Sequence, residues 1–132
     1  MIINPKQQDK IRDLAQRFEL RLFVLFGSQA KDQAGPDSDF DLAYYPTTPI
    51  SFDNELLIIR ELEEIFHSNQ VQLVNLYTAS PLLLKQVVDK GMPLYENAQS
   101  AFNEFYLYAM RLYYEAQPLF ELRRQRLNEL IK

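Results

Sequence analysis

The run Leu22-Phe23-Val24-Leu25-Phe26 ends at Gly27-Ser28, and after ten further residues the chain continues with Asp39-Phe40-Asp41. Five consecutive apolar residues that stop at a glycine predict a short strand buried on both faces of a sheet. The polar stretch from Gly27 to Ser38 contains the turn signal Gly-Pro-Asp and predicts an irregular connection. A second strand is expected from Asp39 to Tyr45, so two carboxylates open the strand that follows this connection.

Helices and short strands are predicted to alternate around this region. Offsets of three and four between apolar residues predict helices at 6–18, 53–66 and 81–90, and short apolar runs predict strands at 71–77 and 92–96. Residues 98–132 predict two helices that meet near Pro118. The expected fold class is therefore α/β (or α+β), with a small mixed sheet flanked by helices. Residues 1–97 would form the core of a single domain, and residues 98–132 would be C-terminal helices that pack on this core, on a partner or on both.

Composition excludes several kinds of site. The 132 residues include no cysteine and only one histidine, His67, so thiolate nucleophiles, Cys-ligated metals and sites with two histidines are ruled out within the chain. Metal chemistry would have to use oxygen ligands, which favour hard cations such as Mg²⁺. The net charge of −4 does not favour direct nucleic-acid binding. No secretory signal or membrane span is apparent, so a cytoplasmic location is expected.

The two strand carboxylates are the strongest chemical signal. Because side chains alternate along a strand, Asp39 and Asp41 should share one face, while Phe40 points into the core on the other. Two like charges held side by side favour a divalent cation between them. Gly27 would let a phosphate approach the backbone, Ser28 would donate hydrogen bonds, and Lys31 would add positive charge. Such an arrangement suits nucleotidyl or phosphoryl transfer.

The stretch from Gly27-Ser28 to Asp39-Phe40-Asp41 resembles the signature of the DNA polymerase β-type nucleotidyltransferases. The small size resembles the minimal nucleotidyltransferase (MNT) antitoxins, which are paired with HEPN-domain toxins. The resemblance implies a polymerase β-like fold with Asp39 and Asp41 as catalytic metal ligands. It also implies two Mg²⁺ ions, with ATP as substrate. The implied function is transfer of AMP to a tyrosine of a HEPN ribonuclease toxin, within a hetero-oligomeric complex of the two proteins.

Gln72 departs from this family pattern. Active members of the superfamily carry a third carboxylate on the third strand, and alignment of VQLVNL places Gln72 at that position. An amide is neither anionic nor a general base. Two hypotheses therefore stay open: an adenylyltransferase whose proton-transfer step is weakened or moved to another group, and a degenerate nucleotidyltransferase that neutralises the toxin by binding and occlusion alone.

Overall fold

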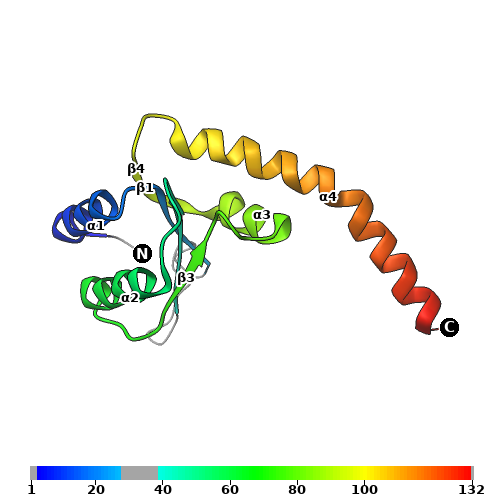
Figure 1. Ribbon diagram of the computed structural model, residues 1–132, viewed down its shortest axis with the longest axis horizontal. Helices are drawn as coiled ribbons and strands as arrows, with labels where there is room; N and C mark the ends of the chain where they lie inside the picture. Colours follow the sequence, from blue (N-terminus) through cyan, green and yellow to red (C-terminus); the bar gives the residue numbers. More distant parts are fainter. Residues whose placement is uncertain (1–2, 28–38, 132) are drawn as a thin grey trace.

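The computed structural model describes residues 3–27 and 39–131, and within them a four-stranded mixed sheet lies at the centre (Figure 1). The strands are β1 (Leu20–Phe26), β2 (Phe40–Pro46), β3 (Val71–Asn75) and β4 (Met92–Glu96), in the spatial order β3-β2-β1-β4. β1 is antiparallel to both of its neighbours, whereas β2 and β3 are parallel. The predicted mixed sheet is therefore confirmed, and β4 lies at an edge as its proline required.

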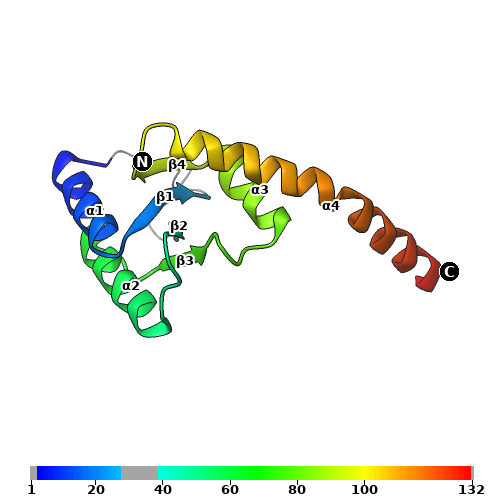
Figure 2. The ribbon, with the colours of Figure 1, turned by 45° about the horizontal axis from the view of Figure 1, so that its top comes forward.

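Helices cover both faces of the sheet (Figures 1 and 2). One face carries α1 (Pro5–Arg17) and α2 (Phe52–Phe66), and the other carries α3 (Pro81–Lys90) and the first half of α4 (Ala101–Ile131). Each pair of helices encloses its own apolar core against the sheet. The predicted arrangement of a sheet flanked by helices is confirmed.

The helix starts follow local capping rules. Asn4 caps α1 and forms a reciprocal capping box with Gln7, while Ser51 and Ser80 cap α2 and α3 through their side-chain oxygens. Pro81 occupies the first turn of α3, where no backbone N–H is needed. These signals explain why the sequence places the helix starts to within a residue or two.

Alternation along β2 assigns its side chains to the two faces. Leu42 and Tyr44 belong to the core under α1 and α2, and Ala43 belongs to the core under α3 and α4. In β1, Leu22 to Leu25 are all buried, with successive residues divided between the two cores. The sequence prediction of a strand buried on both faces is confirmed, and the strand begins two residues earlier than predicted, at Leu20.

The prediction of two C-terminal helices is wrong, because α4 is one helix with Pro118 inside it. Proline removes the hydrogen bond to the carbonyl of residue 114 and usually kinks or breaks a helix. Tyr114 is 64% exposed, so water can satisfy its released carbonyl. Figure 1 shows that the helix bends and continues.

Smaller differences concern boundaries and one helix face. β2 includes Pro46, and β3 ends at Asn75 rather than at Tyr77. The apolar pattern of residues 53–66 predicts that Leu56 and Leu57 belong to the buried face of the helix, but both are exposed on α2, and Ile58 is buried instead. No helix in the described ranges has the length and apolar character needed to cross a bilayer.

Candidate active site

The candidate site lies where β1 ends and β2 and β3 begin. In the register of the sheet, Phe26 lies opposite Asp41, and Asp41 lies beside Gln72 on the parallel neighbour β3. Asp39 immediately precedes β2. Three strands therefore bring Gly27, the two aspartates and Gln72 to the same end of the sheet.

Both aspartates belong to the side of the sheet that α3 covers. Phe40, between them, stacks on Phe66 of α2 with ring centroids 4.7 Å apart, and its N–H donates to the carbonyl of Gln70 at 2.8 Å. These contacts fix the opposite face of β2 against the α2 core, so alternation directs Asp39 and Asp41 away from α2. The geometry agrees with the shared face expected from the sequence.

The two carboxylates interact electrostatically. Partial burial raises the pKa of Asp41, and the nearby charge of Asp39 raises it further. Gln72 donates a hydrogen bond from Nε2 to Oδ2 of Asp39 at 2.9 Å. The amide thus supports Asp39 as a hydrogen-bond donor, a role that a carboxylate in its place would not fill at neutral pH.

Gly27 is needed here for two reasons. Its φ of +75° lies in the left-handed region, which disfavours residues with a side chain. A Cβ at this position would also lie 3.1 Å from Cγ of Asp41 and closer still to its Oδ2. The carboxylate of Asp41 therefore rests directly against the glycine backbone.

Replacing Asp41 by asparagine is expected to stabilise the folded chain at neutral pH in the absence of divalent cations. Because the folded pKa of Asp41 is raised, the folded state binds more protons, and its stability falls as pH rises from the unfolded pKa through the folded pKa. Asp41→Asn removes this cost. Thermal unfolding at pH 7 should therefore show a higher Tm than wild type.

The pH and metal dependence provide the controls for this prediction. The gain in Tm should shrink as the pH is lowered toward the usual pKa range of an aspartate side chain, because wild-type Asp41 is itself protonated there. Addition of Mg²⁺ should raise the Tm of wild type more than that of the variant. An unchanged or lower Tm for Asp41→Asn at pH 7 without metal would contradict the account.

The donor set at this end of the sheet fits a hard cation. Two carboxylates and the amide oxygen available on Gln72 are oxygen ligands, which Mg²⁺ prefers. Across the described part of the chain, no group of three or more His, Cys, Asp or Glu side chains forms a metal cluster, in keeping with an amide at the third position. The predicted phosphate-binding residues Ser28 and Lys31 lie outside the described residues.

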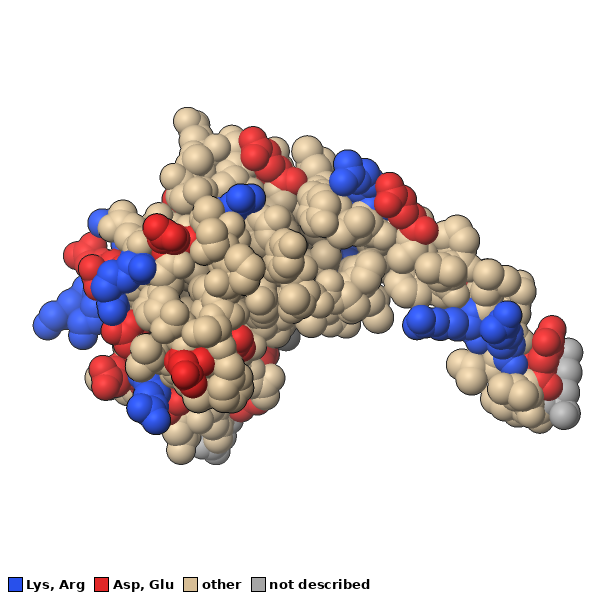
Figure 3. All heavy atoms as spheres, viewed as in Figure 1, with Lys and Arg blue, Asp and Glu red and all other residues tan. Residues whose placement is uncertain are grey.

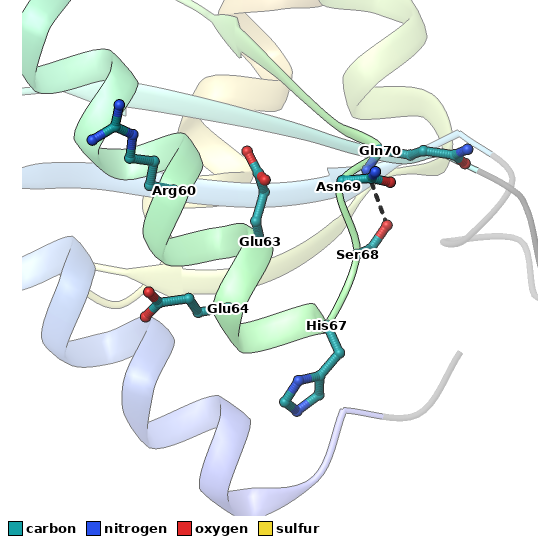
Figure 4. A pocket seen from close by; sticks show the side chains of 7 residues that line it. All are labelled: Arg60, Glu63, Glu64, His67, Ser68, Asn69 and Gln70. Atoms are coloured by element: carbon teal, nitrogen blue, oxygen red, sulfur yellow. Dashed lines mark hydrogen bonds between the residues drawn. The ribbon is translucent and has the colours of Figure 1, made fainter.

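A wider hollow, of about 650 Å³, lies at the end of α2 and the start of β3. Its lining includes His67, which takes a left-handed conformation at the C-cap of α2. Figure 4 shows that the side chains of Arg60, Glu63, Glu64 and His67 point in different directions rather than toward one centre. The hollow thus lacks the convergent groups that a catalytic site needs, and His67 is simply an exposed helix end.

Comparison with known proteins gives one family and several similar structures. The family described as "Polymerase beta, Nucleotidyltransferase" matches residues 9–100. A search of curated proteins gives no significant match.

Among solved structures, the chain is 26% identical to a chain of a toxin-antitoxin crystal structure with AMP-PNP. The TM-score is 0.76, and the match covers 95% of this chain and 98% of that one. It is 25% identical to a chain of a complex between a tri-AMPylated Shewanella oneidensis HEPN toxin and an MNT antitoxin. The TM-score is 0.71, and the match covers 96% of this chain and 98% of that one.

The family match covers more than half of the chain, including β1, both aspartates and Gln72. The fold, a mixed sheet with helices on both faces and a C-terminal helix, is shared along almost the whole length of the similar structures. The chain therefore belongs to the polymerase beta nucleotidyltransferase family.

Proposed function

We propose that this nucleotidyltransferase is an antitoxin that transfers AMP from ATP to a tyrosine of a HEPN-family toxin. The observation that carries the proposal is the interacting pair Asp39 and Asp41 on one side of the sheet, with the carboxylate of Asp41 against Gly27. The similar structures support the choice of partner and nucleotide, since one complex contains AMP-PNP and another contains an AMPylated HEPN toxin.

In the proposed reaction, the tyrosine oxygen attacks the α-phosphorus of ATP, and the bond from that phosphorus to the leaving pyrophosphate breaks. Mg²⁺, held by Asp39 and Asp41, would supply positive charge to the phosphate oxygens. Gly27, which has no Cβ, lets the carboxylate of Asp41 lie against its backbone. Gln72 orients Asp39 through its hydrogen bond, and its amide accepts no proton from the tyrosine at neutral pH.

The direct test incubates the chain with its cognate toxin, Mg²⁺ and ATP labelled on the α-phosphate. Covalent label on a toxin tyrosine, accompanied by loss of ribonuclease activity, is the expected result. The alternative, neutralisation by occlusion alone, draws support from the amide of Gln72. It predicts loss of ribonuclease activity with no label on the toxin and no requirement for ATP.

Gln72→Glu is expected to increase AMP transfer about tenfold or more in the presence of Mg²⁺. The substitution keeps the side-chain length, adds a third carboxylate and supplies a proton acceptor, and such acceptors contribute roughly 10²- to 10⁴-fold in enzymes. Initial rates of label transfer measure the effect.

Asn75→Asp is the matched control, because it adds the same charge to the other end of the same strand. The control should transfer AMP at the wild-type rate; Asn75 accepts a hydrogen bond from the N–H of Tyr77 through Oδ1, a bond that a carboxylate preserves. Equal rates for Gln72→Glu and wild type would show that the third position does not limit the reaction.

The toxin is further proposed to dock on the outer half of α4, residues 119–131. The first half of the helix buries Phe105 and Ala109 against the core, whereas every residue from 121 to 131 is exposed. Figure 1 shows this half extending away from the sheet and the other helices. An isolated helical segment of this length is only marginally stable in water, so a partner surface would supply the packing that it lacks.

The exposed apolar residues of the outer half lie on one side of the helix. Leu119, Leu122, Leu127 and Leu130 are each more than half exposed, and their spacings of 3, 8 and 11 residues place them within one broad stripe. Figure 3 shows Lys and Arg side chains gathered on the same part of the helix. An apolar stripe bordered by basic residues suits docking into an apolar groove with acidic edges.

A further inference from the structure

A second hollow, of about 350 Å³, opens directly beside the candidate active site. Its lining residues come from the end of β1 and from the last two turns of α3: Phe26, Gly27, Gln86, Asp89 and Lys90. β4 starts at Met92, which pairs with Leu25 of β1. The end of α3 is therefore held at the same end of the sheet as the two aspartates.

The hollow and the carboxylates lie on the same side of the sheet. Phe26 packs with the core under α3 and α4, as does Ala43, which lies two residues after Asp41 on β2. Gly27 lines the hollow and also rests against the carboxylate of Asp41. The hollow therefore adjoins the carboxylate site through Gly27.

The charge of the hollow comes from Lys90. Asp89 forms an ion pair with Lys85 of the same helix, which compensates its negative charge. None of the ion pairs between described residues involves Lys90. Gln86 precedes Lys90 by four residues, so an amide and an ammonium group project from the same side of α3. A lysine in the last turn also stabilises the helix end, but that role requires neither the hollow nor Gln86.

We propose that Lys90, assisted by Gln86, binds the β- and γ-phosphates of the nucleotide. This inference rests on the proposed function and adds a nucleotide-binding residue from an element outside the sequence motif. When the α-phosphorus bond to the bridging oxygen breaks, its electron pair leaves with pyrophosphate, and the tyrosine proton is released to water. The ammonium group of Lys90 neutralises charge on the departing pyrophosphate, and the amide of Gln86 donates a further hydrogen bond.

The test measures displacement of a fluorescent ATP analogue from the full chain in Mg²⁺ by ATP, by inorganic pyrophosphate and by AMP. Lys90→Met should weaken the affinity for ATP and for pyrophosphate about tenfold, the loss expected for one charge-assisted contact. Its affinity for AMP should change less than twofold. Lys90→Arg should retain most of the affinity. Lys10→Met, which removes the same charge from an exposed position on α1, is the control and should bind all three ligands as wild type does.

The outcomes separate this inference from the proposed function. If Lys90→Met weakens the affinity for AMP as much as the affinity for pyrophosphate, the hollow binds the nucleoside and the inference is wrong. If Lys90→Met binds all three ligands like wild type, Lys90 serves only the helix end and the inference is again overturned, while the proposed function stands. Failure of the wild-type chain to bind the ATP analogue in Mg²⁺ would overturn both.

Discussion

The double variant Asp39→Asn, Asp41→Asn is expected to lose AMP transfer to the toxin by a factor of at least about 10³. Removing a single group that stabilises transition-state charge typically costs roughly 10²- to 10³-fold, and this variant removes both carboxylates of the site. Asparagine keeps the size of each side chain but carries no negative charge to hold Mg²⁺. The measurement is the initial rate of label transfer from α-labelled ATP to the toxin.

Asp9→Asn, Asp13→Asn is the matched control for this experiment. It removes two negative charges from α1, where both side chains are more than two-thirds exposed and lie on the opposite side of the sheet. Its transfer rate should stay within about twofold of wild type, because exposed ion pairs contribute little to stability. Label transfer that persists in the Asp39, Asp41 variant would remove these residues from the mechanism.

The same double variant discriminates between the two proposed modes of neutralisation. Loss of label together with loss of toxin neutralisation supports neutralisation by AMP transfer. Loss of label with full neutralisation supports occlusion, since both substitutions lie at the end of the sheet and leave the proposed docking surface on α4 unchanged. The variant should fold normally, because Asp41→Asn on its own is expected to raise the Tm.

Much of the candidate site was predictable because it depends on short-range periodicity. The alternation of Asp39, Phe40 and Asp41 follows from the period of two along a strand, and the structure shows Phe40 stacked on Phe66 as that period requires. The assignment of Gln72 to the position of a third carboxylate rests on a resemblance to a family rather than on the residues themselves. Its basis in the structure is the parallel register of β2 and β3.

The contacts that the sequence did not predict involve residues distant along the chain. The hydrogen bond from Gln72 to Asp39 joins residues 33 positions apart, and the hollow between Gly27 and Lys90 depends on the pairing of β1 with β4. Neither Gln86 nor Lys90 forms a recognisable motif with the aspartates. Contacts of this kind depend on strand register and helix placement, which local patterns do not determine.

Pro118 shows how a local rule can mislead. A proline within a helical pattern usually marks a boundary. Pro118, however, has strong helix formers on both sides: Glu115, Ala116 and Gln117 before it and Leu119 after it. One lost hydrogen bond at an exposed position costs less than ending a helix whose neighbours all favour it. The continuous helix carries its apolar stripe beyond the core, and this feature leads to the second large prediction.

Deleting residues 121–132 is expected to weaken binding to the cognate toxin at least about 100-fold while leaving the core folded. No residue from 121 to 131 is buried, so the Tm of the isolated chain should change little. Phe120 is retained because it contacts Tyr113, with ring centroids 6.1 Å apart. The loss of affinity follows from removing three exposed leucines and Ile131, since a few apolar anchors typically carry most of the energy of an interface. Calorimetry with purified toxin measures it.

Substitutions within the intact helix separate loss of the apolar stripe from loss of length. In one variant, glutamine replaces Leu122, Leu127 and Leu130 together. These substitutions keep helix propensity and remove only apolar surface, so toxin binding should weaken at least about tenfold. The control variant combines Glu121→Gln, Gln125→Ala and Glu129→Gln, which change as many side chains on the same segment. Its affinity for the toxin should stay within about threefold of wild type. Equal affinity for the leucine variant and wild type would place the toxin elsewhere on the chain. Concentration-dependent self-association of wild type that the leucine variant lacks would identify a second copy of the chain as the occupant of the stripe.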